Sequence, residues 1–384
     1  MTLSLSHHHL TSFKPLPSCH VTFHAIHNHL LYASTGNIIH AIDTSTFTIL
    51  DTFTVTKPSS GSVKSVTFTN GNIFTAHQDN KIRVWKLTEN KRHKHIATLP
   101  TFEDRLFRSV LPKNYVKVRR HRKKLWIEHH DAVSGLSVIT GQLICSVSWD
   151  KHLKIWRTTD NFRCMQSIKA HDDAINCVVV SADGTIYTGS ADRKIKLWGK
   201  VCEKYGLIAT LEKHKSAVNA LALNDDGSVL FSGGSDCVIL VWGKVHGSNG
   251  MVSREVVRGH FKAVLRLVGV CDLLFSGSAD RTVRIWQRGC EGKYCCLKVL
   301  DGYEKPVRSL VVNRSDATFD SRNGSNVRVF SERSDKVIRM LTIEGLNLSK
   351  SMCDGCIRNA LLEALYLWLC NGDSKMLNDA LRIV

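Results

Sequence analysis

The sequence predicts an all-β fold, a seven-bladed β-propeller of four-stranded sheets with a short helical C-terminal tail. A unit of about 40 residues recurs along the chain, as one propeller blade requires. Each unit divides into short β-favouring runs separated by turn residues. Apolar residues at 43% and charged residues at 22% are typical of a globular protein rather than a disordered or membrane protein. We expect the propeller to span residues 8–342 and the tail to span residues 343–384.

Each clear unit contains a strand-like run, a turn with an aspartate, and a second run that ends in tryptophan. The clearest copies are 187–198, with the sequence YTGSADRKIKLW, and 275–286, with the sequence FSGSADRTVRIW. Successive tryptophans are 71, 42, 44 and 44 residues apart, and the last three spacings fit one blade each. In every unit the aspartate precedes the tryptophan by six positions. The five pairs are Asp79 and Trp85, Asp150 and Trp156, Asp192 and Trp198, Asp236 and Trp242, and Asp280 and Trp286.

A histidine stands upstream of the later units and opens another apolar run. The histidines of the three later units are His171, His214 and His260. His130 is the candidate for the unit that ends at Trp156. These residues resemble the WD-repeat family, and five copies carry the resemblance. Within that family the chain is similar to plant proteins of the JINGUBANG type, because of segments 111–129 and 289–297.

The resemblance implies that the repeated polar residues are structural. In the family the aspartate accepts a hydrogen bond from the histidine ring, the histidine contacts a hydroxyl, and the hydroxyl meets the tryptophan indole. Here the hydroxyls are Ser146, Thr188, Ser232 and Ser276. Histidine, aspartate and serine together also suggest a hydrolytic triad, but a catalytic triad is needed once, beside an oxyanion hole. A set that recurs in blade after blade is better explained as a stabilising device, so we expect no enzyme.

Two degenerate units bring the predicted number of blades to seven. Residues 21–54 contain four β-favouring runs without the aspartate and tryptophan. Residues 307–341 supply only three runs, with Asp335 in the turn and Leu341 and Tyr303 at the tryptophan and histidine positions. The resemblance implies that an N-terminal strand, near residues 8–14, pairs with this last blade and closes the ring. Closure would remove exposed strand edges.

The net charge of +18 is concentrated in one region. Residues 81–130 contain fifteen Lys or Arg and four Asp or Glu, a net charge of +11, and about thirty of these residues, near 100–130, form an insertion. Connections between blades emerge on the face that carries the histidines, the top face, so the insertion is expected at that face or its rim. Its candidate partner-binding residues are Lys113, Lys117, Arg119, Arg120, Arg122, Lys123, Lys124 and Trp126.

Three interpretations of this basic insertion remain open. It is a solvated charged loop, a docking surface for an acidic protein segment or a nuclear-import receptor, or a contact for nucleic acid or anionic lipid. Base stacking has little support, because Tyr115 and Trp126 are its only aromatic residues after Leu111.

The sequence predicts no cofactor, metal or catalytic site. It contains no P-loop, Rossmann glycine pattern or His-Glu-x-x-His motif. Thirteen cysteines are scattered, and Cys353-x-x-Cys356 lacks the second pair of a structural zinc site. Residues 1–17 do not resemble a secretory signal, and the longest apolar stretch, 360–370, is too short to span a bilayer. We therefore expect reduced thiols in the cytosol or nucleus.

The expected function is a non-enzymatic scaffold or adaptor that binds protein partners through its top face. The resemblance implies a regulatory role in a plant cell, in the nucleus, the cytoplasm or both. A nucleic-acid or phosphoinositide binder acting through the basic insertion is the alternative. Helices are expected over 356–370 and 374–383; packing on the propeller, binding of a partner helix and an altered reading frame remain open for this tail. The sequence does not name the partner.

Overall fold

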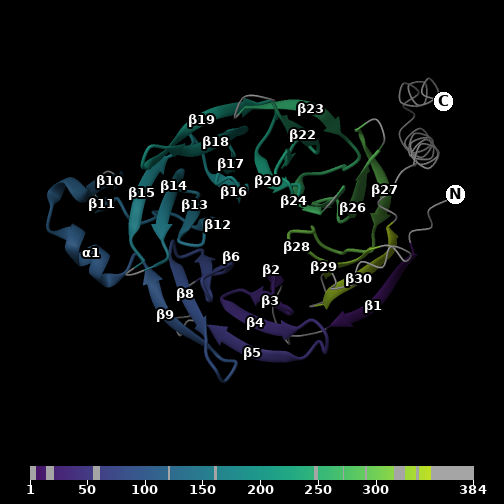
Figure 1. The fold of residues 1–384 in the computed structure, drawn as a ribbon, viewed down its shortest axis with the longest axis horizontal. Coiled ribbons are helices and arrows are strands. Elements are labelled where there is room, and N and C mark those ends of the chain that lie inside the picture. The colour runs from purple at the N-terminus through teal and green to yellow at the C-terminus, as the bar shows by residue number, and fades with distance from the viewer. Residues whose placement is uncertain are drawn as a thin grey trace.

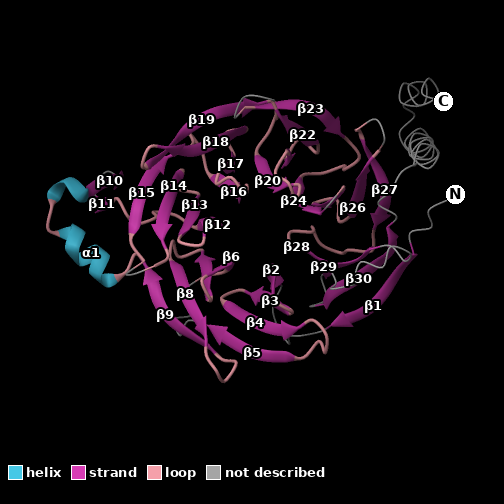
Figure 2. Ribbon diagram, in the orientation of Figure 1, coloured by secondary structure: helices cyan, strands magenta, loops and turns pink. Residues whose placement is uncertain are grey.

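The computed structural model describes residues 6–13, 21–54, 61–119, 122–159, 162–245, 250–270, 272–289, 292–314, 325–333 and 337–346. In Figure 1 these residues form a ring of sheets around a central axis. Figure 2 shows that strands make up the ring and that the helices of the described residues lie outside it. The expected C-terminal helices fall on residues 347–384, outside the described residues.

Six four-stranded sheets are each built from four consecutive antiparallel strands, and these sheets are the blades. Blade 1 contains β2 (Val21–His27), β3 (Leu30–Thr35), β4 (Ile38–Asp43) and β5 (Ile49–Thr54). Blade 2 contains β6 (Val63–Thr69), β7 (Asn72–His77), β8 (Ile82–Leu87) and β9 (His93–Leu99). Blade 3 contains β12 (Val133–Thr140), β13 (Leu143–Ser148), β14 (His152–Arg157) and β15 (Cys164–Lys169).

The other three blades follow without an insertion. Blade 4 contains β16 (Ile175–Val180), β17 (Ile186–Ser190), β18 (Lys194–Val201) and β19 (Lys204–Glu212). Blade 5 contains β20 (Val218–Leu223), β21 (Val229–Gly234), β22 (Ile239–Lys244) and β23 (Met251–Val257). Blade 6 contains β24 (Val264–Val270), β25 (Leu273–Ser278), β26 (Val283–Arg288) and β27 (Tyr294–Leu300).

One further four-stranded sheet joins the two ends of the chain. Its order is β1-β30-β29-β28, where β1 is Ser6–Phe13, β28 is Leu310–Arg314, β29 is Ser325–Arg333 and β30 is Val337–Leu346. We call it the composite sheet, because its outer strand comes from the N-terminal region. The structure therefore has six blades continuous in sequence and a closing sheet of a different kind, which corrects the expected count of seven blades. The physical reason is that the last segment supplies three strands and no aspartate–tryptophan pair in its described residues.

The composite sheet packs between blade 6 and blade 1. Leu310 and Val329 share a buried cluster with Phe275 and Ile285 of blade 6. On the other side, Phe330 packs with Leu31, Ala33 and Ile42 of blade 1. Figure 1 shows β28, β29, β30 and β1 filling this part of the ring. Pairing of β1 with β30 thus covers a strand edge that would otherwise be free.

The glycine of the repeated Ser-Gly or Thr-Gly pair explains how closely the blades approach each other. A Cβ on Gly189 would lie 2.7 Å from Val218 Cγ1, and one on Gly277 would lie 2.8 Å from Val307 Cγ1. These valines belong to the segment that starts the next sheet around the ring. Since real Cβ contacts do not come so close, the missing side chain lets neighbouring sheets pack face to face.

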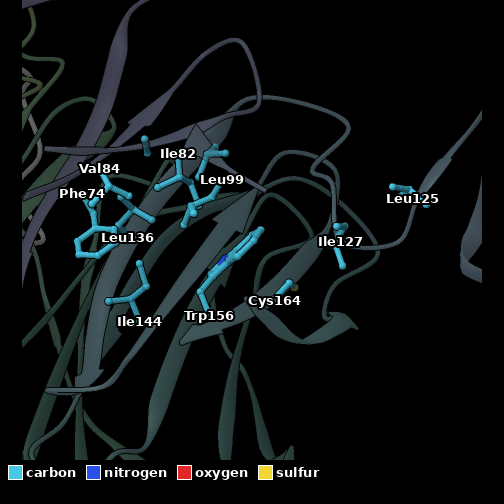
Figure 3. Close-up of a cluster of buried hydrophobic side chains, with 12 residues drawn as sticks. Phe74, Ile82, Val84, Leu99, Leu125, Ile127, Leu136, Ile144, Trp156 and Cys164 are labelled. Atoms are coloured by element: carbon cyan, nitrogen blue, oxygen red, sulfur yellow. The ribbon is translucent and has the colours of Figure 1, made fainter. Parts of the chain in front are cut away.

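The interior of the ring consists of apolar clusters between neighbouring sheets. Strands β17 and β21 are buried along their whole length, whereas in the outer strand β9 only Leu99 is buried. One cluster, drawn in Figure 3, joins blades 2 and 3 through Phe74, Val84 and Trp156. Leu125 and Ile127 belong to the same cluster, so the end of the basic insertion is part of the core.

Candidate protein-binding surface

The repeated polar residues form closed hydrogen-bonded sets inside the blades. In blade 4, His171 Nδ1 lies 2.8 Å from Asp192 Oδ2, and His171 Nε2 lies 2.8 Å from Thr188 Oγ1. Trp198 Nε1 donates to the same hydroxyl at 3.0 Å. A carboxylate only accepts, so the proton is on Nδ1 and the hydroxyl donates to Nε2. Each polar group of the set therefore has a partner.

Blades 3, 5 and 6 repeat this geometry. The histidine-to-aspartate distances are 2.8 Å, 2.9 Å and 2.7 Å, and the histidine-to-hydroxyl distances are 2.7 Å, 2.8 Å and 2.7 Å. The tryptophan indole donates to the hydroxyl at 2.8 Å, 2.9 Å and 2.8 Å. The sets are His129, Asp150, Ser146 and Trp156; His214, Asp236, Ser232 and Trp242; and His260, Asp280, Ser276 and Trp286.

Blade 3 corrects one predicted residue. His129 enters the set, not His130, whose backbone N–H donates to Asp150 Oδ2. The two histidines are adjacent, so the sequence pattern alone did not distinguish them. A turn after β11, closed by the Glu128 N–H and the Leu125 carbonyl, places Ile127 in the core and His129 in the set.

Blade 2 departs from the set in a different way. Asp79 forms an ion pair with Arg83, whose Nη2 lies 2.5 Å from Asp79 Oδ2. The hydroxyl of Thr75 accepts from Trp85 Nε1 at 3.0 Å and lies 2.8 Å from His77 Nε2. A histidine two residues after the hydroxyl thus replaces the missing upstream histidine.

The composite sheet keeps part of the same arrangement. Tyr303, at the expected histidine position, is buried, and its hydroxyl lies 2.6 Å from Ser331 Oγ. Ser331 is two residues after Val329, which pairs with Leu341 at the expected tryptophan position. Asp335 lies outside the described residues.

In blades 3 and 4 the surroundings favour neutral histidines and charged aspartates. Burial lowers the pKa of His171 and of His129, although Asp192 and Asp150 oppose this shift. Burial alone would raise the pKa of Asp150, but the adjacent His129 ring and further hydrogen bonds hold it below its usual range. Neutral Nδ1–H histidines are the form that the hydrogen bonds require, so charge and geometry agree.

The basic insertion is a folded unit at the outer rim of the ring. It consists of helix α1 (Phe102–Ser109), a 3₁₀ turn (Pro112–Asn114), and the hairpin of β10 (Tyr115–Arg119) and β11 (Arg122–Leu125). Figures 1 and 2 place α1, β10 and β11 outside the ring, beside β15. The rim was one of the two expected positions, but the helix was not predicted. Pro100 and the capping pattern of Thr101 with acidic residues in the first turn are the signals that could have found it.

Polar side chains attach α1 to blade 3. Asp104 is buried, and its carboxylate accepts from Arg108 Nε at 2.8 Å and from the Cys164 N–H at 3.3 Å. Arg108 Nη2 donates to the Cys164 carbonyl at 3.1 Å. The hydroxyl of Thr101 accepts from the Asp104 N–H at 3.2 Å and caps the helix. The helix is thus fastened to the backbone of β15 through an ion pair.

The apolar side chains of α1 face solvent. Phe102 is 72% exposed, Leu106 58%, Phe107 80% and Val110, just after the helix, 75%. Phe102, Leu106 and Val110 follow one another at intervals of four residues, which places them on one side of the helix, and Phe107 lies beside Leu106. A surface helix normally turns such residues toward the core. Here Asp104 and Arg108 face the protein, while the apolar residues face outward together with Glu103 and Arg105.

The hairpin carries most of the predicted basic residues. Lys113, Lys117 and Lys123 are exposed, and Lys124 is half-buried. In the hairpin register Lys117 lies opposite Lys123, and Arg119 lies opposite Arg122. Arg120 lies outside the described residues.

Trp126, a predicted partner-binding residue, also supports the insertion itself. It is half-buried, its ring lies 4.5 Å from Arg108 Cζ, and its Nε1 donates to Asn114 Oδ1 at 3.3 Å. Asn114 in turn donates to the Arg108 carbonyl at 2.8 Å. The indole face is occupied, so Trp126 positions α1 and the 3₁₀ turn.

A cavity of about 850 Å³ lies where the insertion meets blade 2. Its lining includes Ile96 of β9, Phe102 of α1, Lys124 of β11, Lys81 and the ion pair of Arg105 with Glu128. A second cavity of about 620 Å³ lies between the hairpin and blade 3, with Lys117 and His130 in its lining. The insertion thus forms hollows on both of its sides.

Comparison with known proteins agrees with the repeat pattern. Residues 122–157, 162–199, 206–243 and 252–287 match the WD40 repeat, described as WD domain, G-beta repeat. Pre-mRNA-processing factor 17 of Homo sapiens and that of Mus musculus are each 28% identical over 94 residues, covering 24% of this chain. Cell division control protein 4 of Candida albicans is 27% identical over 157 residues, covering 40% of this chain. The matched regions span 16%, 16% and 20% of these relatives, a small part of their length.

The ring of sheets and the repeated sets define a β-propeller, and four segments of it match the WD40 repeat. The four matched segments correspond to blades 3 to 6, which are the blades with complete histidine sets. In the described part of the chain, no helix has the length and apolar character needed to cross a membrane.

Proposed function

We propose that this protein is a non-enzymatic scaffold that binds protein partners through the top face and the basic insertion. The observation that carries the proposal is the closed geometry of the repeated sets. The histidines and hydroxyls that suggest hydrolytic chemistry are buried, the aspartate side chains are at most 11% exposed, and these groups bond to one another in four blades. The polar groups most suited to catalysis are thereby used for folding.

Exposed aromatic side chains support the top face as one binding region. Trp149 lies in the turn that carries Asp150, and Phe261 follows His260. Both are exposed, and Lys64 Nζ lies 5.7 Å from the centre of the Trp149 ring. Aromatic residues are frequent anchors of protein interfaces.

The basic insertion supports the second binding region. Its exposed lysines favour an acidic protein segment or an import receptor, because clustered cations speed association with acidic partners. The alternative is a nucleic-acid or phosphoinositide contact, which the same cations favour. Base stacking is less well supported, since Arg108 and Asn114 already occupy Trp126.

The biological setting rests on resemblance. The names of the relatives refer to pre-mRNA processing and to cell division control. The segments 111–129 and 289–297 resemble plant JINGUBANG-type proteins. We infer a regulatory role in the nucleus, the cytoplasm or both.

Comparative affinity capture tests the proposed function. Four immobilised baits are compared. The first three are the intact protein, a Trp149→Ala/Phe261→Ala variant, and a variant with alanine at Lys113, Lys117, Arg119, Arg120, Arg122, Lys123 and Lys124. The matched control is Leu207→Ser/Val252→Ser, which changes exposed apolar residues on the outer strands of blades 4 and 5. We expect mass spectrometry to identify proteins retained by the intact and control baits and lost from one of the other two. Identical retention on all four baits would contradict the proposal.

The salt dependence of RNA and vesicle binding distinguishes the nucleic-acid or phosphoinositide alternative from the scaffold proposal. Nucleic-acid or phosphoinositide binding through the insertion predicts a steep loss of RNA or vesicle affinity with salt, which neutralisation of the seven residues blunts. The scaffold proposal predicts weak RNA and vesicle binding that is the same for intact and neutralised protein.

A further inference from the structure

We propose that the outer surface of the insertion binds an acidic amphipathic segment of a partner protein. Apolar side chains of that segment would pack on the exposed residues of α1, and its carboxylates would meet the lysines of the hairpin. This inference rests on the proposed scaffold function and assigns the chemistry of one partner. We call the surface of Phe102, Leu106, Phe107, Lys117 and Lys123 the insertion surface.

The orientation of α1 leaves its apolar residues exposed, which supports an interaction site. Its inward residues are the ion-paired Asp104 and Arg108, while Phe102, Leu106, Phe107 and Val110 are each more than half exposed. Contiguous exposed apolar patches on a folded protein typically mark interaction sites. Four such residues within nine positions of one element are a patch rather than scattered apolar side chains.

The charge arrangement of the β10–β11 hairpin also supports an acidic partner. Lys117 directly opposes Lys123. Like charges directly opposite each other destabilise an antiparallel pair. A two-stranded hairpin is also marginal in isolation. Carboxylates placed between these cations would relieve the repulsion, so the hairpin gains stability from an acidic partner.

One hollow joins α1 to the hairpin at Lys124, whereas Lys117 lines the second hollow, on the other side of the insertion. Phe102 of α1 and Lys124 of β11 line the same cavity of about 850 Å³, together with the exposed Ile96. Apart from the Arg83–Asp79 and Arg105–Glu128 ion pairs, the charged residues of the lining are Lys81, Lys124 and Glu103, so cations outnumber carboxylates. A concave site with apolar residues and an excess of cations fits the ridge of an acidic amphipathic helix. A flat bilayer does not enter a hollow, so a membrane fits less well. A second copy of this chain is disfavoured, because both copies carry a net charge of +18.

Selection from a peptide library tests the inference while the partner itself is unidentified. A phage-displayed library of random 16-residue peptides is selected on the intact protein, and the enriched peptides are synthesised. We expect peptides rich in Asp and Glu with Leu or Phe at helical spacing. Their dissociation constants are then measured for the intact protein and for variants by fluorescence anisotropy.

The variants separate the two parts of the surface. Phe102→Ser/Phe107→Ser should weaken the acidic peptides about tenfold or more, as loss of interface anchors does. Lys117→Ala/Lys123→Ala should weaken them about tenfold at low salt and flatten the salt dependence. Leu207→Ser/Val252→Ser, the matched control on blades 4 and 5, should leave the affinity unchanged. Thermal unfolding of each variant shows that the ring remains folded.

Several outcomes would overturn the inference. These are enrichment of no peptide, of peptides without acidic residues, or of peptides that bind the two insertion variants as tightly as the intact protein. Tighter binding of vesicles containing phosphatidylserine, or of poly(U) RNA, with loss in the same variants, would assign the surface to another ligand. If captured partners depend on Trp149 and Phe261 alone, the scaffold proposal stands and this inference fails.

Discussion

The hydroxyl at the centre of each repeated set is the residue on which the set depends most. In blade 5, Ser232 is buried, lies 2.8 Å from His214 Nε2 and accepts from Trp242 Nε1 at 2.9 Å. One small side chain thus satisfies two buried rings. The five aspartate–tryptophan pairs and three of the histidines could be predicted from spacing. His129 and His77 could not, because their roles depend on which neighbour the strand turns inward.

The first prediction concerns this hydroxyl. Ser232→Ala leaves the His214 and Trp242 nitrogens without a partner, and unsatisfied buried groups cost about 1–3 kcal/mol. Urea unfolding should show a lower free energy of unfolding by this amount. Ser235→Ala, at an exposed serine of the same blade, should change it by less than about 0.5 kcal/mol. Equal effects of the two substitutions would show that the set contributes no stability.

The second prediction concerns pH. Burial lowers the pKa of His24 and of His77 from 6.5 to about 3, with help from nearby Arg266 and Arg83 respectively. The unfolded chain binds protons at these histidines near pH 6.5, whereas the folded chain does not until about pH 3. Their stabilisation is therefore present above pH 6.5 and is lost as the pH falls toward 3.

Urea unfolding at pH 7, 6 and 5 measures this effect. We expect the free energy of unfolding to fall progressively below pH 6.5, by about 1.4 kcal/mol per pH unit for each such histidine once the unfolded form is protonated. Lowered pKa values of His129 and His171 act in the same direction. A free energy that is constant between pH 7 and 5 would contradict the neutral state of these rings.

At the scale of elements, the insertion shows both the reach and the limit of sequence analysis. Its position, its charge and its basic residues could be predicted, because an interrupted repeat is visible as a long tryptophan spacing. Its helix and the outward apolar face could not, since they depend on Asp104 and Arg108 binding the backbone at Cys164. That contact joins residues about 60 positions apart and leaves no local pattern.

The third prediction tests the charge arrangement of the hairpin. Lys123→Glu places a carboxylate opposite Lys117, so an opposite-charge pair replaces a repulsive one. Amide hydrogen exchange of β10 and β11 should slow in this variant. Lys113→Glu, in the 3₁₀ turn outside the paired strands, is the charge-matched control and should leave the exchange unchanged. Slowing that is equal in both variants would mean that net charge, and not the cross-strand pair, sets hairpin stability.

At the scale of the whole molecule, closure of the ring depends on β1. Pairing between the two ends of the chain was predicted, but the count of seven blades required correction to six blades and a composite sheet. The tryptophan spacing identifies blades 2 to 6 well, since each of them contains a motif tryptophan, whereas blade 1 has none. The tryptophan spacing does not identify the composite sheet, because the strands of that sheet contain no tryptophan and its outer strand, β1, comes from the N-terminal region.

The fourth prediction follows from this closure. Deletion of residues 1–13 removes β1 and exposes the edge of β30. We expect a lower midpoint of thermal unfolding and greater light scattering, since an exposed strand edge promotes aggregation. Deletion of residues 1–5, which leaves β1 intact, is the control. Equal midpoints and scattering for the two deletions would show that β1 does not close the ring.

The central claim is that the repeated polar sets hold the propeller together and the insertion surface binds the partner. The affinity of one enriched acidic peptide for three proteins tests it most directly. We expect Phe102→Ser/Phe107→Ser to weaken binding about tenfold at an unchanged unfolding midpoint. Ser232→Ala should lower the midpoint and leave the affinity of the folded protein unchanged. Loss of affinity in Ser232→Ala, with full affinity in the insertion variant, would contradict the account.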